Sequence, residues 1–148
     1  MFKKLSSEIA FFQSHPLGMR VLLLTNLIYA LVMPIVELFV GAYIMRNSED
    51  ISLVVIFQLA VYTGIPLTFM INGFLLNHFP IARLYSLGML LSGVSMFAMM
   101  SLDQLDTLGV FFAGLIMGLS YGFFWANRDY LALNTTKDGN RNYYYGIE

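Results

Sequence analysis

The chain has 148 residues, of which 58% are hydrophobic and only 11% charged, with a formal net charge of −1 and a mean hydropathy of +0.70. A soluble domain carries roughly 25% charged residues, so this chain does not have enough polar groups to cover its surface in water. The near-neutral charge gives no electrostatic basis for nucleic-acid binding, and the absence of cysteine excludes thiol and zinc–thiolate chemistry.

Residues 1–20 precede the apolar part of the chain. They begin with two lysines and place three apolar residues on one helical face ahead of Pro16, namely Leu5, Ile9 and Phe12. This pattern is typical of an amphipathic helix lying on the membrane surface, and a disordered tail is the alternative. In either case we expect a cytoplasmic lead-in.

Four long apolar runs follow, at about 21–45, 51–76, 81–102 and 107–127. Each is long enough to cross a bilayer as a helix, which takes about 20 residues. The connections are short, so neighbouring helices should be antiparallel. The sequence therefore predicts an all-α membrane protein with a four-helix transmembrane bundle over 21–127 and a cytoplasmic loop over 128–148.

The distribution of basic residues predicts the orientation of the bundle. Of the eight Lys and Arg residues, only Arg46 falls on one side of the predicted spans, and the other seven fall on the opposite side. Because Lys and Arg are enriched in cytoplasmic loops, both termini should be cytoplasmic. We expect a multi-pass protein of the cell (inner) membrane.

The first run contains a carboxylate, Glu37, three residues after Pro34. A charge at the centre of a spanning helix costs about 2.5–3.5 kcal/mol on insertion scales. Helical spacing places Glu37 on one stripe with Asn26 and Gly41, opposite the large apolar side chains. Two interpretations remain: a structural acid satisfied by Gln58 or a backbone group, or a proton, cation or substrate contact in a central cavity.

The second run also carries polar residues near mid-span, beside Pro66. Gln58 should lie at about the depth of Glu37, and Tyr62 follows it on the same helical face. We therefore predict a substrate or proton site formed by Glu37, Gln58, Asn26 and Tyr62. From Leu84 to Leu102 the third run has no amide and no charge, and it is expected to face lipid most.

The fourth run contains two overlapping GxxxG steps, formed by Gly114, Gly118 and Gly122. Such a glycine face lets two helix backbones approach closely, so it should pack against the first or second run. The two histidines, His15 and His78, lie outside the spans with no metal-ligand spacing, and we expect no metal site. The sequence contains no nucleotide-binding, hydrolase or metalloprotease motif, so neither a cofactor nor an enzymatic activity is expected.

The segment "GFLLNHFPIAR", residues 73–83, resembles the loop between the second and third helices of the major facilitator superfamily. The pattern in that family is Gly, any residue, Leu, any residue, Asp, Arg or Lys, an aromatic, Gly and two basic residues. Gly73 and two further residues match, Asn77 and His78 replace the acid and the base, and Arg83 follows one place after the basic pair. The resemblance implies that these four residues form a conformational loop.

That resemblance implies a partial N-terminal bundle of a secondary transporter, which moves a small solute between two six-helix halves and is in some cases proton-coupled. Four helices are about a third of such a protein, so we expect an N-terminal fragment that leads towards a fifth helix. Its partners would be the lipid bilayer, a small-molecule solute, and the remaining helices or a second copy. The alternatives are a complete four-helix dimeric efflux protein of the small multidrug resistance type, or a non-transporting membrane subunit.

Overall fold

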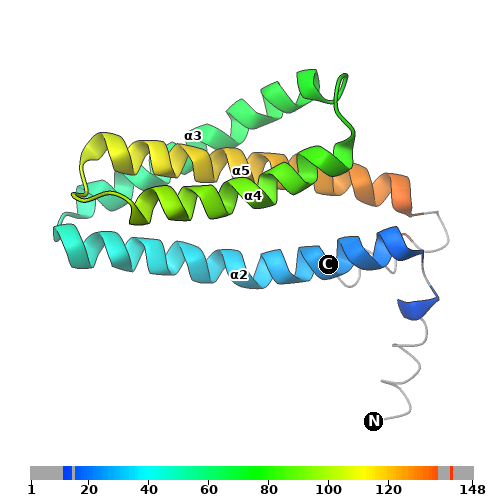
Figure 1. Ribbon diagram of the computed structural model, residues 1–148, viewed down its shortest axis with the longest axis horizontal. Coiled ribbons are helices and arrows are strands. Elements are labelled where there is room, and N and C mark those ends of the chain that lie inside the picture. The colour runs from blue at the N-terminus through cyan, green and yellow to red at the C-terminus, as the bar shows by residue number, and fades with distance from the viewer. Residues whose placement is uncertain (1–11, 15, 137–140, 142–148) are drawn as a thin grey trace, which may run out of the picture. The chain divides into compact units, whose positions relative to one another are not determined.

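The computed structural model describes residues 12–14, 16–136 and 141 (Figure 1). Its principal helices are α2 (Leu17–Ser48), α3 (Ile51–Leu75), α4 (Ile81–Met100) and α5 (Thr107–Thr135). Each of the four is long and apolar enough to cross a membrane. The prediction of four helices able to span a bilayer is therefore confirmed, while the side on which the termini lie stays a prediction.

The largest differences from the predicted helix boundaries are at the start of α2 and the end of α5. Helix α2 begins at Leu17, and α5 continues to Thr135, so the loop predicted from residue 128 is wrong up to that point. The stretch from Arg128 to Thr135 contains no Gly or Pro and includes the good helix formers Leu and Ala, so nothing local ends the helix at the membrane boundary. Most of the predicted amphipathic segment over 1–20 lies outside the described residues.

The chain divides into two compact units, one comprising residues 1–34 with 128–148 and the other residues 35–127. Helices α2 and α5 contribute to both. The second unit, called here the core unit, holds the C-terminal part of α2, all of α3 and α4, and most of α5. The contacts described below lie within the core unit unless stated otherwise.

Helices α3 and α5 pack as a parallel pair through the glycine face of α5. A Cβ atom at Gly114 would stand 2.7 Å from the carbonyl oxygen of Phe57, and one at Gly118 would overlap the carbonyl oxygen of Val61. The contacts advance by four residues on both helices, so the two run in the same direction. Only glycine leaves room for this approach, which brings the α3 backbone onto the surface of α5.

Helix α4 packs on another side of α5 in the antiparallel sense. Ser95 Oγ donates to the carbonyl oxygen of Ala113, and Ser120 Oγ donates to that of Gly88, each at 2.8 Å. The most apolar stretch of α4 is 28% buried, as is that of α3, against 17% for α2 and 56% for α5. The expectation that the third run faces lipid most is therefore wrong, because its small residues, serine and glycine, bind it to α5.

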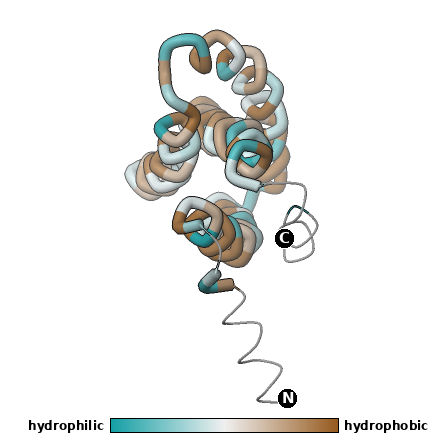
Figure 2. Tube along the Cα trace, turned by 90° about the vertical axis from the view of Figure 1, so that its right-hand side faces the viewer, coloured by the Kyte–Doolittle hydropathy of each residue, from teal (hydrophilic) through white to brown (hydrophobic). Residues whose placement is uncertain are grey.

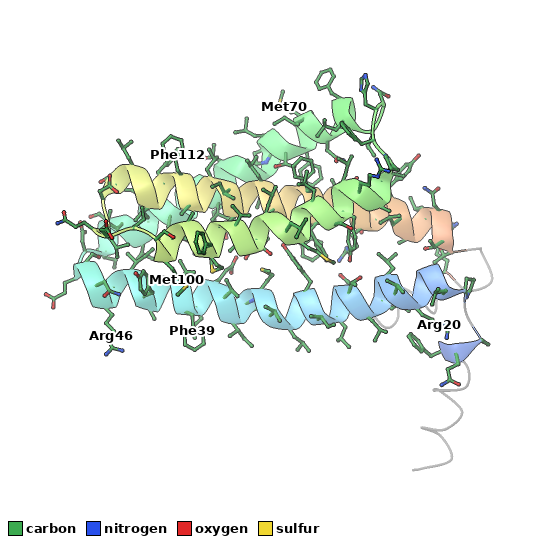
Figure 3. All side chains as sticks on the ribbon, viewed as in Figure 1. Arg20, Phe39, Arg46, Met70, Met100 and Phe112 are labelled. Atoms are coloured by element: carbon green, nitrogen blue, oxygen red, sulfur yellow. The ribbon has the colours of Figure 1, made fainter. Side chains whose placement is uncertain are left out.

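Large apolar side chains cover the outer surface of all four helices. Leu38 of α2, Phe74 of α3, Phe97 of α4 and Phe112 of α5 are all exposed, and hydrophobic residues predominate along the tube in Figure 2. Figure 3 shows the sticks of Phe39, Met70 and Phe112 projecting outward from their helices. An apolar surface of this extent is unsuited to water, whereas helices satisfy their own backbone hydrogen bonds in lipid. This surface is compatible with a membrane protein whose helices lie in a bilayer.

We predict that Gly118→Ala destabilises the protein by about 1–3 kcal/mol, because its methyl group would overlap the α3 backbone, which cannot rotate away. The matched control is Gly93→Ala, on α4, where an added Cβ meets nothing within 4 Å. That variant should be neutral or slightly stabilised. Thermal unfolding in detergent, followed by circular dichroism, makes the comparison. Equal melting temperatures for the two variants would show that the glycine face is not a packing surface.

Candidate functional site

The principal polar contact deep in the core unit joins α2 to α5. Tyr121 Oη donates a hydrogen bond to Glu37 Oε1 at 2.7 Å, with Glu37 half-buried and Tyr121 only 7% exposed. Glu37 lies about 16 Å from the end of α2 at Ser48, and Tyr121 about 21 Å from the start of α5 at Thr107, at 1.5 Å per residue. A hydroxyl that donates to a carboxylate makes one of the stronger hydrogen bonds in proteins.

The position of Tyr121 follows from the packing of α5. It directly precedes Gly122, so its side chain is turned about 100° around the helix from the glycine face. Helix α5 can therefore lie against α3 with one side and present a phenol to α2 with another. Because the ring is buried, the packing around it fixes where the hydroxyl lies.

The predicted partner of Glu37 was Gln58, and the structure differs. Gln58 is half-buried, and within the described part of the chain Glu37 bonds to Tyr121 and not to Gln58. Tyr62 is 69% exposed on the outer side of α3. Asn26 lies in the other unit, where it is buried and its Oδ1 has no hydrogen-bond partner among the described residues. The core unit thus brings Glu37 together with a residue that was not predicted.

Tyr121 was missed because the fourth run was interpreted only through its glycines. The sequence held only a coarse signal. Counted from the predicted run ends at 45 and 107, Glu37 and Tyr121 lie about 9 Å apart in depth, and the observed helix ends at Ser48 and Thr107 reduce this difference to about 5 Å. A phenol at the depth of a buried acid is a natural hydrogen-bond donor for it.

A second buried polar pair links α3 and α5. Asn127 Nδ2 donates to Asn72 Oδ1 at 2.9 Å and to the carbonyl oxygen of Phe123 at 2.8 Å, and both asparagines are buried. Asn127 Oδ1 has no hydrogen-bond partner among the described residues. The pair adds a hydrogen bond between two helices that already pack against each other at the glycines of α5.

The predicted conformational loop connects α3 to α4 at the surface. Gly73 is exposed with open space around it, and Asn77, His78 and Arg83 are also exposed. His78 Nδ1 lies 3.3 Å from the carbonyl oxygen of Phe74. The described side chains of these four residues are not hydrogen-bonded to one another, so their joint role stays a prediction. Over the described ranges, no three acidic or histidine side chains converge as a metal site.

Part of the chain is similar to a bacterial protein. No protein-family model matches the chain, and no solved structure matches it. Over 119 residues, or 80% of the chain, it is 25% identical to a Geobacillus stearothermophilus protein described as an uncharacterized protein in the sodM 3′ region. The matched part is 56% of that protein, so the chain spans about half the length of the curated relative.

We predict an energetic coupling between Glu37 and Tyr121. In a double-mutant cycle with Glu37→Leu and Tyr121→Phe, unfolding in detergent should give a coupling free energy of about 1 kcal/mol, within the range measured for hydrogen bonds between membrane helices. The control cycle pairs Glu37→Leu with Tyr62→Phe, since Tyr62 is exposed on α3. It should give a value near zero. Equal coupling in both cycles would mean that the Tyr121 bond does not form in the folded protein.

Proposed function

We propose that this chain is part of a secondary active transporter of the major facilitator type, and that Glu37 is its contact for a proton or a small solute. The observation that carries the proposal is the hydrogen bond between Glu37 and Tyr121 deep within apolar helices. Carboxylates at membrane depth are costly, and by default they indicate a functional site.

The geometry of the pair leaves hydrogen-bond acceptor sites of the Glu37 carboxylate unused. A carboxylate has two oxygens with about four acceptor sites, and within the described residues its hydrogen bond to Tyr121 uses one oxygen, Oε1. Glu37 is half-buried and not fully enclosed. Acceptor capacity therefore remains for a proton, a water molecule or a polar group of a solute.

The phenol allows Glu37 to change its protonation state without losing its partner. When the carboxyl group is ionised, the Tyr121 hydroxyl donates to it. When the carboxyl group carries a proton, that proton can be donated to the lone pairs of the same hydroxyl oxygen. A pair that tolerates both states suits a site that takes up and releases protons during a transport cycle.

The loop resemblance supports the choice of family. The segment from Gly73 to Arg83 runs from the last turn of the second membrane-span candidate to the first turn of the third, where the family has its patterned loop, and its polar residues are exposed at the surface. With seven of the eight basic residues on one side, the proposed orientation places this loop and both termini in the cytoplasm.

The orientation can be tested with single cysteines, because the chain contains none of its own. Asn77→Cys and Gln104→Cys introduce thiols at exposed positions in the loops that precede and follow α4. An impermeant maleimide applied to intact cells should label only Gln104→Cys, and Asn77→Cys should be labelled only after permeabilisation. Wild-type protein is the unlabelled control. The reverse labelling pattern would contradict cytoplasmic termini.

The proposed role of Glu37 predicts a loss of proton-coupled transport in Glu37→Gln, which keeps the size of the side chain and removes the exchangeable carboxyl proton. Membrane vesicles that contain the whole transporter to which the chain would belong, loaded with a pH-sensitive dye, would be challenged with a fixed panel of sugars, amino acids, organic acids and organic cations. We expect at least one solute to move protons in wild-type vesicles, and about a hundredfold or greater loss in the variant, the magnitude typical of removing a proton-transfer group.

The control for that experiment is Glu49→Gln, which makes the same chemical change in the exposed turn between α2 and α3. It should transport as wild type does. If Glu37→Gln and wild type give indistinguishable proton signals across the whole panel, Glu37 has no part in coupling and the proposal is wrong.

A further inference from the structure

An apolar groove lies between α2 and α4 within the core unit, separate from the Glu37–Tyr121 pair. Its volume is about 280 Å³, and it is lined by α2 residues between Ile35 and Tyr43 and by three methionines of α4, Met96, Met99 and Met100. All of its lining residues except Tyr43 are fully apolar. Methionine side chains are flexible and polarisable, so they adapt to a chain-like ligand.

A separate polar pocket lies nearer the ends of the helices. Its volume is about 450 Å³, and Tyr43 lines both spaces. The pocket is bordered by the carboxylates of Asp50 and Asp103 and by the amides of Asn47 and Gln104. The groove and the pocket, which share Tyr43, are here called the α2–α4 site; its groove is apolar and its pocket, at the loops, is acidic.

The acidic end has no cation of its own. The residues that line the pocket include two aspartates and no Lys or Arg. Arg46, on the last turn of α2, is exposed, and Figure 3 shows its side chain pointing away from α4. Asp50 accepts a hydrogen bond from the Ser52 amide at 2.8 Å, and Asp103 makes no hydrogen bond or ion pair with the described residues. The pocket is therefore electrostatically complementary to a cationic group.

We propose that the α2–α4 site binds an amphiphilic cation, with a single alkyl chain in the groove and an ammonium group between Asp50 and Asp103. The groove extends from Ile35 to Tyr43, about 12 Å along α2, which accommodates a medium to long alkyl chain. The polar pocket would lie at the membrane interface, where the ammonium group binds, and the apolar groove would lie in the hydrocarbon region, where the alkyl chain binds.

Phospholipids fit this site less well than a simple alkylammonium. The phosphate of a phospholipid would be brought towards two carboxylates, and like charges in proximity are unfavourable. An alkylammonium dissolved in the membrane can instead enter laterally from lipid, where Phe39 and Met100 border the groove and are exposed. Glu37 lines neither space, so the inference does not depend on the proposed transport function.

Photo-crosslinking tests the proposal on the full chain in phosphatidylcholine nanodiscs. The probe is a dodecyltrimethylammonium that carries a diazirine in its tail, and the matched probe is a dodecyl sulfate with the same tail. Mass spectrometry should locate the cationic adduct on peptides that contain Met96–Met100 or Ile35–Tyr43. Its yield there should exceed that of the anionic probe by about tenfold, as one strong charge contact predicts.

Two sets of variants separate the contributions of the tail and the head. Val36→Trp fills the groove and should lower labelling by about tenfold, whereas Leu38→Trp, which is exposed on α2 outside the groove, should not. Asp50→Asn combined with Asp103→Asn keeps the shapes and the helix cap and should remove the preference for the cation. Asp106→Asn, in the same loop as Asp103 but outside the pocket, should retain it.

Several results would overturn the proposal. Equal labelling by the two probes in wild type would show a general site for alkyl chains, and adducts spread over all four helices would show no site. Unchanged labelling in Val36→Trp would place the tail elsewhere. If Val36→Trp lost its helical circular dichroism signal, the test would rest on the variant that combines Asp50→Asn with Asp103→Asn. A preference for the cationic probe that persisted in that variant would contradict binding of the ammonium group by the two aspartates.

Discussion

The close approach of α3 to α5 is the contact on which the rest of the core unit depends. Lipid is as apolar as the helix surfaces, so no hydrophobic force drives membrane helices together, and packing and hydrogen bonds must do so. Gly118 lies against Val61 and Gly64 with no side chain between the two backbones. Helix α5, which carries this contact, is the most buried of the four helices.

The other contacts of α5 also involve small groups, here the hydroxyls of threonine and serine. Thr68 Oγ1 donates to the carbonyl oxygen of Gly64 at 2.9 Å and lies 3.3 Å from that of Leu119. Ser95 and Ser120 bond to backbone oxygens across the contact with α4. Hydroxyls that find a carbonyl in this way hold helices close without leaving an unpaired polar group in hydrocarbon. Tyr121 also carries a hydroxyl but has a larger side chain, and its hydroxyl donates a hydrogen bond from α5 to the Glu37 carboxylate on α2.

The sequence was sufficient for some features because they are properties of single helices. Length and apolarity identify a span, and a charge such as Glu37 is conspicuous against an apolar run. Helical periodicity also brings Gly114, Gly118 and Gly122 onto one face. Periodicity does not specify which helices meet, so Gln58 was chosen as the partner of Glu37 where the structure has Tyr121. The end of α5 was misplaced for a related reason, since loss of apolarity after residue 127 marks the membrane boundary and not the end of a helix.

The proposed role of Glu37 depends on its contact with Tyr121 inside the folded protein in a bilayer. Magic-angle-spinning NMR of protein in lipid vesicles, with carbon-13 in the Glu side-chain carboxyl and the Tyr ring carbon that bears the hydroxyl, measures that contact directly. A hydrogen bond of 2.7 Å predicts a cross-peak between the two carbons that disappears in both Glu37→Gln and Tyr121→Phe. A spectrum without that cross-peak, or one in which it survives either substitution, would contradict the pairing.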